Sequence, residues 1–213
     1  MDVAYRTEVG HVRSRNEDAV LARPERGLLA VADGLGGHPA GDVASLTALS
    51  SVDASVLRAD SSEDDLRAAA AAAHQAVLDA AATEPGRTGM GTTLVLAAVS
   101  DGAALVLHVG DSRAYQLSAD GRLSAVTEDH GVHGYLTQAL GLDREVAPDV
   151  ARLECPPGSR LLLCTDGLTN MVDDAELAEL LGRGSARDAC DALVEAALEA
   201  GGVDNVTVVV VTF

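Results

Sequence analysis

"TTLVLAAVSDGAALVLHVGDSRAYQLSADGRLSAV", residues 92–126, decides the class of fold. Two Asp-Gly pairs, at 101–102 and 120–121, each stand between runs rich in valine, leucine and alanine. Asp-Gly tolerates the positive φ angles that a tight turn between antiparallel strands requires. The stretch therefore predicts two successive β-hairpins, which are typical of antiparallel sheets and not of alternating βαβ units.

The segments around these hairpins predict further strands and four helices. Short apolar runs indicate strands at 27–32, 160–164 and 205–212. Helical patterns cover 39–57, 61–82, 173–182 and 185–202, and in the second of these Ser62 precedes Asp65 at the spacing of a capping box. This order favours an α+β fold with helices on the outer faces of antiparallel sheets. The length of 213 residues suits a single domain over 1–213.

Composition narrows the classes of partner. The net charge is -18, so a nucleic-acid backbone would be repelled, and aromatic residues make up only 2% of the chain. No leader-like segment or bilayer-length apolar run is found, so we expect a cytoplasmic protein without membrane contact, and a monomer. The three cysteines share no metal-ligand spacing, and we expect them to be small buried side chains.

Aspartates mark the ends of four predicted strands. Three apolar runs end in Asp33, Asp111 and Asp166, and the last strand begins after Asp204. If the last strand runs antiparallel to the others, all four carboxylates meet at one rim of the β core. Each aspartate alone reads as a turn residue. Four in this pattern favour a cation site, because clustered carboxylates stay ionised only beside positive charge.

The ligand types indicate which cation. The acids have no His or Cys cluster near them in sequence, so oxygen-preferring Mg²⁺ or Mn²⁺ is favoured over Zn²⁺. In "VRSRNED", Arg13 precedes the acidic pair Glu17 and Asp18. Arginine binds phosphate through two parallel hydrogen bonds, and together with a metal site it suggests a phosphoryl substrate.

Eight motifs in order give a resemblance over residues 4–213. They are "VRSRNED", "VADGLGGH", "MGTTL", "HVGDSRAY", "TEDH", "LTQALG", "LLLCTDGL" and "DNVTVVVV". In order and spacing the chain resembles the metal-dependent Ser/Thr protein phosphatases, the PPM or type 2C family, in their bacterial form. The resemblance implies a four-layer αββα sandwich of two antiparallel β-sheets flanked by helix pairs.

The resemblance also implies a binuclear Mn²⁺ or Mg²⁺ centre. Asp33 would bridge the two ions, Asp166 and Asp204 would complete one of them, and Glu17 with the Gly34 carbonyl would serve the other. Asp18 would hold metal-bound water, and Arg13 would bind the substrate phosphate. A hydroxide shared by the metals would then hydrolyse phosphoserine and phosphothreonine in proteins, opposing an intracellular Ser/Thr kinase.

Three positions depart from the family pattern. Animal members carry a histidine where this chain has Leu35, so either water or His38 would protonate the leaving oxygen; we favour water. A third ion in bacterial relatives uses the equivalents of Asp111 and Asp166 together with an aspartate that is Asn170 here. The sequence therefore predicts a weak or absent third site.

The third departure is a shortened flap. Only "GVHGY" separates His130 from Leu136, where bacterial relatives carry a longer loop beside the active site. Such loops select substrates, so specificity is the property least securely carried over. An alternative function is therefore a catalytically weak regulator that keeps the fold and binds phosphoprotein partners. The i, i+3 pair His130 and His133 has no Cys or Glu partner and does not indicate zinc.

Overall fold

The computed structural model describes residues 1–35, 40–132, 135–142 and 145–213. Its strands form two five-stranded antiparallel sheets, each named here by a strand inside it. The β12 sheet has the order β1 (Asp2–Glu8), β12 (Val206–Thr212), β11 (Arg160–Cys164), β6 (Arg113–Leu117), β7 (Leu123–Ala125). The β4 sheet has the order β10 (Asp149–Glu154), β5 (Ala103–Val109), β4 (Leu94–Ser100), β3 (Leu28–Asp33), β2 (Asp18–Arg23). A separate hairpin pairs β8 (Gly131–Val132) with β9 (Tyr135–Leu136).

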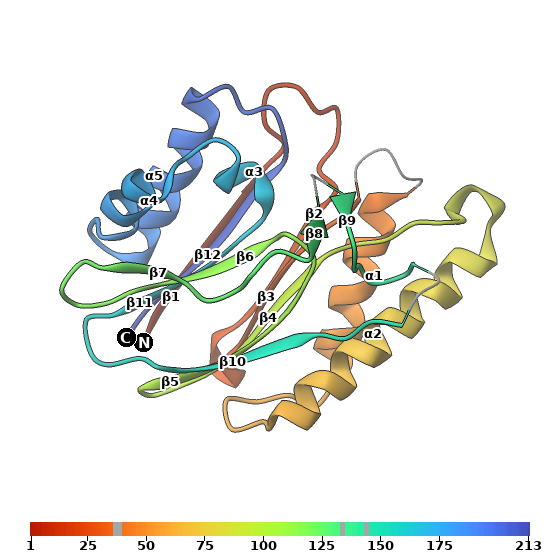
Figure 1. Ribbon diagram of the computed structural model, residues 1–213, viewed down its shortest axis with the longest axis horizontal. Coiled ribbons are helices and arrows are strands. Elements are labelled where there is room, and N and C mark those ends of the chain that lie inside the picture. Colours follow the sequence, from red (N-terminus) through yellow and green to blue (C-terminus); the bar gives the residue numbers. More distant parts are fainter. Residues whose placement is uncertain (36–39, 133–134, 143–144) are drawn as a thin grey trace.

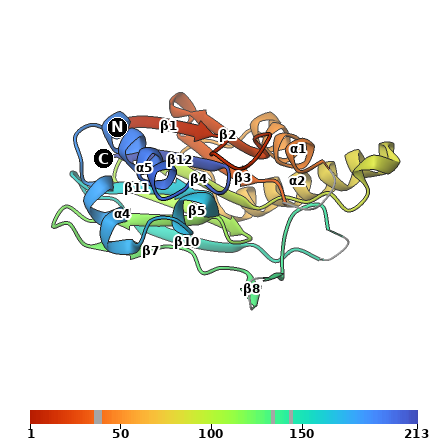
Figure 2. The same cartoon turned by 90° about the horizontal axis from the view of Figure 1, so that it is seen from above.

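Helices cover the outer face of each sheet. The β4 sheet carries α1 (Gly41–Ala54) and α2 (Glu63–Thr83), and the β12 sheet carries α3 (Asp166–Thr169), α4 (Asp174–Leu181) and α5 (Ala186–Glu199). Short 3-10 turns lie at Pro24–Arg26 and Pro85–Arg87. Figures 1 and 2 show the resulting order of helices, sheet, sheet and helices, with the two termini side by side. The predicted four-layer α+β sandwich is confirmed.

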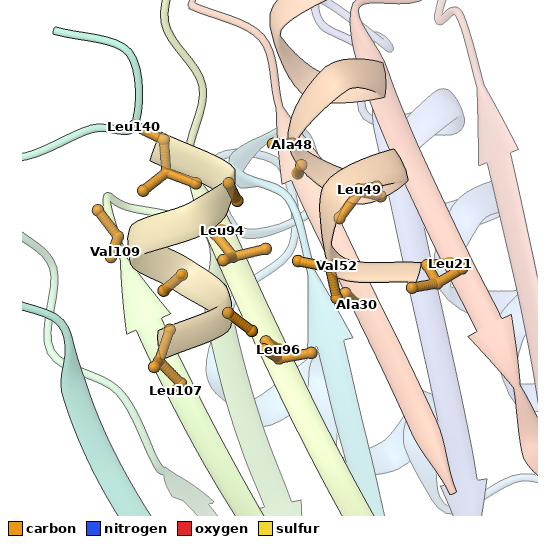
Figure 3. Close-up of a cluster of buried hydrophobic side chains, with 14 of the residues drawn as sticks. Leu21, Ala30, Ala48, Leu49, Val52, Leu94, Leu96, Leu107, Val109 and Leu140 are labelled. Atoms are coloured by element: carbon orange, nitrogen blue, oxygen red, sulfur yellow. The ribbon is translucent and has the colours of Figure 1, made fainter. Parts of the chain in front are cut away.

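Three apolar clusters hold these layers together. One lies between the β4 sheet and its helices, where Ala48, Leu49 and Val52 of α1 face Leu21 and Ala30 (Figure 3). A second fills the space between the two sheets, and a third packs α3, α4 and α5 against the β12 sheet. Alternate residues of one strand feed different clusters, as the two-residue period of a strand requires. Each sheet is therefore buried on both faces.

The Asp-Gly turns form as predicted, with Gly102 at φ +80° and Gly121 at φ +86°. The β4–β5 and β6–β7 hairpins follow from them. The two hairpins nevertheless belong to different sheets, so β5 and β6 do not pair. The chain crosses between the sheets at Gly110, whose φ is +112° and where an added Cβ would stand 2.6 Å from Thr93 Cγ2. This position requires glycine both for its backbone angle and for its space.

Three edge strands of the two large sheets, and the short strands β8 and β9, were not predicted from the sequence. β1 and β10 are edge strands with mostly exposed or half-buried residues, and β2 closes the other edge of the β4 sheet. Edge strands carry weaker apolar patterns because one side faces solvent or a neighbouring loop. The short helix α3 was also missed, since four residues give too little helical periodicity to detect.

The four longer helices follow their predicted segments to within three residues at each end. The Ser62 capping box is present at the start of α2, and a second one joins Ser185 to Asp188 at α5. The three cysteines are buried and free, as expected. In the part of the chain that the structure describes, every helix is too short or too polar to cross a bilayer.

A buried histidine gives the fold an acid-sensitive point. His108 on β5 is 1% exposed, and neither ring nitrogen has a hydrogen-bond partner among the described residues. Its ring lies 4.6 Å from that of His130, measured between centroids. Burial, and then the nearby His130, lower the pKa of His108 from 6.5 to about 4. The folded protein thus holds this imidazole neutral in a pH range where the unfolded chain protonates it.

We expect this group to lower stability in mild acid. Because the unfolded chain binds the extra proton, the free energy of unfolding should fall by roughly 2 kcal/mol between pH 7 and pH 5 from His108 alone. Urea unfolding of wild type and His108→Leu at both pH values measures the effect as a difference. The variant keeps every carboxylate, so their opposite contributions cancel. Equal pH dependence in the two proteins would contradict the expectation.

Candidate active site

One cavity of about 560 Å³ opens at the end of the sandwich where the four aspartates lie. Its lining comprises Arg13, Glu17, Asp33, Gly34, Leu35, Thr93, Asp111, Tyr135, Leu136, Leu142, Asp166, Asp204 and Asn205. All the site residues named from the sequence line it except Asp18, which is buried beside it. Segments from almost the whole length of the chain therefore meet in one pocket.

Strand register explains this meeting. Asp18 begins β2 and Asp33 ends β3, and the two are direct partners across that antiparallel pair. Asp166 follows β11 and Asp204 precedes β12, which runs antiparallel to β11. Asp111 lies where the chain passes from β5 to β6. Antiparallel pairing places the end of one strand next to the start of its neighbour, so all five acids reach the same end of the fold.

Burial and mutual repulsion act on the two innermost carboxyls. Burial raises the pKa of Asp18 to about 7, although hydrogen bonds from Thr207 (2.6 Å) and Thr165 (2.9 Å) to its Oδ2 favour the ionised form. Burial and then the charges of Asp18 and Asp166 raise the pKa of Asp33 well above its usual value. The protein therefore confines negative charge here at a free-energy cost.

Asp111 and Asp166 form the outer part of the acidic cluster. Burial and the neighbouring Asp166 raise the pKa of Asp111 to about 6. Burial and then Asp204 raise the pKa of Asp166. The Asn170 amide donates a 3.0 Å hydrogen bond to Asp166 Oδ2. Asn170 thus supplies a donor at a position where a carboxylate would supply another negative charge.

Arg13 is the cationic side chain among the residues that line this pocket. Its Nη2 donates a 2.7 Å hydrogen bond to Asp204 Oδ2, and the guanidinium is 39% exposed. Asp204 therefore engages a single nitrogen of this guanidinium. A partly exposed guanidinium beside an acidic pocket suits capture of a phosphoryl oxygen from solvent.

The residues present fit a divalent cation site. The donors that surround the pocket are carboxylate and backbone oxygens, the set that Mg²⁺ and Mn²⁺ prefer. Asp18 Oδ1 is buried and has no hydrogen-bond partner among the described residues, so it keeps a free acceptor next to Asp33. Across the described ranges, however, no three His, Cys, Asp or Glu side chains are already spaced as ligands of one ion. In the structure, Asp204 accepts a hydrogen bond from Arg13, and Asp166 accepts one from Asn170.

Gly34 is required for a reason that the sequence did not indicate. A Cβ there would stand 2.2 Å from the Gly41 carbonyl oxygen and 2.8 Å from that of Glu17. The missing side chain lets the start of α1 approach the end of β3, and it is this backbone contact that the glycine serves. The following positions 36–39, including His38, lie outside the described residues.

Asn205 is a site residue that sequence reasoning missed. Its Oδ1 accepts a 2.8 Å hydrogen bond from the Glu17 amide, and its Nδ2 donates to the carbonyls of Val9 (2.9 Å) and Arg15 (3.0 Å). One side chain therefore fixes both ends of the loop that carries Arg13 and Glu17. The only signal in the sequence was its place after Asp204, because its partners are backbone groups that leave no motif.

The shortened flap forms the β8–β9 hairpin at the mouth of the pocket. Its base is held where the His130 amide donates to Gly110 O (2.7 Å) and Thr137 N donates to His130 O (2.8 Å). The His130 ring lies 2.9 Å from Asp149 Oδ2. Figure 1 shows the hairpin at the same end as α3, and Figure 2 shows it projecting from the body. His133 lies outside the described residues.

The fold and the acidic pocket define a class of protein, the two-sheet α+β sandwiches with an oxygen-rich site at one end. The family model of protein phosphatase 2C matches residues 9–200. The chain belongs to the protein phosphatase 2C family.

Individual relatives agree with this assignment. The chain is 37% identical to the Ser/Thr protein phosphatase PstP of Mycobacterium tuberculosis, over 97% of this chain and 44% of that protein. It is 33% identical to the Ser/Thr phosphatase stp of Listeria innocua, over 99% of this chain and 95% of that protein. The chain thus spans less than half of the mycobacterial relative and nearly all of the Listeria one.

Solved structures match equally broadly. A bacterial serine phosphatase superposes with a TM-score of 0.91 at 29% identity, covering 100% of this chain and 97% of the other. The catalytic domain of PstP in complex with two manganese ions superposes with a TM-score of 0.86 at 36% identity, covering 98% and 96%.

Proposed function

We propose that this protein hydrolyses phosphoserine and phosphothreonine in proteins with the help of two divalent cations, Mn²⁺ or Mg²⁺. The observation that carries the proposal is the convergence of Asp33, Asp166 and Asp204 with Arg13 in one pocket. Family membership and two relatives named as Ser/Thr phosphatases support the same activity. They favour an enzyme over the alternative of a catalytically weak regulator.

Within this proposal the acidic residues hold the cations. Asp33, Asp166, Asp204, Glu17 and the Gly34 carbonyl are the candidate ligands, and Asp18 accepts a hydrogen bond from water beside them. When bound, divalent cations lower the pKa of water and neutralise the charge of phosphoryl oxygens. The manganese ions of the PstP catalytic domain support this choice of cofactor.

The chain's own residues position the substrate. Arg13 binds a phosphoryl oxygen through its free guanidinium edge, and Asn205 fixes the loop that carries Arg13. Leu35 lines the pocket without a titratable proton, so water is favoured over His38 as the group that protonates the leaving serine or threonine oxygen. No side chain is phosphorylated during the reaction.

Two substrates and one chelator test the proposal. Hydrolysis of nitrophenyl phosphate and of a phosphothreonine peptide would be measured with Mn²⁺ and again with excess EDTA. We expect hydrolysis of both with Mn²⁺ and of neither with EDTA. Hydrolysis that persists in EDTA would contradict the cation requirement. A protein that hydrolyses neither substrate would favour the alternative function, a catalytically weak regulator.

Asn170 leads to a prediction about cation number. Its amide already donates to Asp166, and it brings no negative charge to Asp111. We expect calorimetric titration with Mn²⁺ to give two sites, with a third that is weak or absent. Asn170→Asp should add a third site, because a carboxylate there attracts a further cation. Three equally tight sites in the wild type would contradict this expectation.

The remaining sequence predictions are part of the same proposal. They are a single domain over residues 1–213, a cytoplasmic location, a monomer, the absence of nucleic-acid and membrane partners, and an opposing Ser/Thr kinase. The single domain is supported by the apolar cluster that both sheets share. Net charge -18 supports the prediction that nucleic acid does not bind.

A further inference from the structure

The pocket has a second wall that the cation and phosphate chemistry does not use. Opposite in character to the aspartates, it consists of Leu35, Tyr135, Leu136 and Leu142, named here the apolar wall. Leu35 lies just after β3, and Tyr135 and Leu136 form β9. Leu142 lies two residues after Leu140, which forms an isolated β-bridge with Thr92. A cavity of about 560 Å³ is of the size that holds a whole small ligand, so it has room for more than a phosphoryl group.

The inner part of this wall is a continuous surface over Gly91. An added Cβ at Gly91 would stand 2.9 Å from Leu35 Cδ1 and 3.2 Å from Leu142 Cδ2, so both leucines converge on the same point. The Leu35 amide donates a 2.9 Å hydrogen bond to Gly91 O, which fixes this arrangement. The absence of a side chain at Gly91 therefore leaves room for both leucines of the apolar wall.

The outer part of the wall is exposed aromatic surface. Tyr135 is 80% exposed, and its register partner Val132 is 55% exposed. The chain has only three tyrosines and one phenylalanine, and it places one of them at the pocket mouth. The base of the hairpin is anchored through His130, and Tyr135 on this hairpin lines the pocket. Exposed apolar surface that continues into a pocket marks a contact site for a ligand.

Resting on the proposed function, we propose that the apolar wall binds an apolar side chain next to the phosphorylated residue, and that Tyr135 determines this preference. The Cα atoms of consecutive residues are about 3.8 Å apart, so the residue on either side of the phosphorylated one stays at the pocket mouth. An acidic neighbour is disfavoured by the four aspartates and by the net charge of -18. The substrate class is thus a phosphopeptide with an apolar neighbour.

Paired phosphothreonine peptides test the proposal. Each pair differs only by Leu or Asn, residues of similar size, either directly before or directly after the phosphothreonine. We expect the wild type to prefer Leu by roughly tenfold in kcat/KM at one of the two positions. Tyr135→Ala should reduce this ratio to about twofold, and Tyr135→Phe should keep it. Because the ratio is taken within one enzyme, a general change in catalysis cancels.

Tyr5→Ala is the matched control, since Tyr5 is 47% exposed on β1 and does not line the pocket. It should keep the wild-type ratio. No Leu preference in the wild type, or the same preference in Tyr135→Ala, would overturn the apolar wall as a binding site. Nitrophenyl phosphate has no flanking residue, so its hydrolysis by the wild type tests the proposed function separately from the wall.

Discussion

Asp33→Asn should lower kcat/KM for nitrophenyl phosphate by at least about a thousandfold in saturating Mn²⁺, because it removes the carboxylate proposed to bridge both cations. The same substitution should raise the Tm measured in EDTA. Burial, and then the charges of the neighbouring aspartates, raise the pKa of Asp33 well above its usual value, and a neutral amide avoids both penalties. Steady-state kinetics and calorimetry on one preparation measure both effects.

Two further variants sharpen this result. Asp204→Asn should lose activity to a similar degree without the gain in Tm, because Asp204 has the cationic partner Arg13 at 2.7 Å. Asp60→Asn, on the exposed segment between α1 and α2, should change neither quantity. If Asp33→Asn keeps more than a tenth of wild-type activity, the proposed bridging role is wrong.

Arg13→Ala should lower kcat/KM for a phosphothreonine peptide by roughly a hundredfold, mainly through KM. Charge-assisted hydrogen bonds to phosphate are worth about 1.5–3 kcal/mol each, and this guanidinium is the cation that lines the pocket. The affinity for Mn²⁺ should instead increase. Removing a positive charge 2.7 Å from Asp204 makes the pocket more negative, so cations bind several-fold more tightly.

Arg15→Ala is the matched control for this variant. Arg15 lies two residues along the same loop, is 65% exposed, and reaches Asp42 only at 3.5 Å. Its replacement should leave peptide kinetics and Mn²⁺ affinity within about twofold of wild type. If Arg13→Ala leaves both KM and the affinity for Mn²⁺ unchanged, Arg13 neither binds the substrate phosphate nor reduces the negative charge of the pocket.

The sequence predicted the parts of the site that carry charge. Asp33, Asp111, Asp166 and Asp204 stand directly beside strong apolar runs, and strand polarity alone brings such positions to one end of a sandwich. Asn205 could not be found in this way, because it acts on backbone groups of Val9, Arg15 and Glu17 that have no sequence signature.

The parts of the fold that escaped prediction depend on long-range pairing. The hairpin turns depend on local residues, so the turns at Asp101-Gly102 and Asp120-Gly121 could be predicted from the sequence. The crossing at Gly110 depends instead on which sheet β6 joins. The edge strand β1 pairs with β12, at the other end of the sequence, and β10 pairs with β5, from which four other strands separate it. The residues of both edge strands are mostly exposed or half-buried. Register and sheet membership are properties of the assembled core.

The position of β12 sets a condition on how the molecule is made. It lies between β1 and β11, so β1 has its backbone hydrogen-bonding partner in a strand that is synthesised long after it. Until residues 204–212 are available, the nascent chain lacks Asp204, the Asn205 hydrogen bonds to the Arg13 loop and the strand that joins β1 to β11. Pairing between strands so far apart in sequence is slow, so we expect the site to be complete only after β12 has paired with β1 and β11.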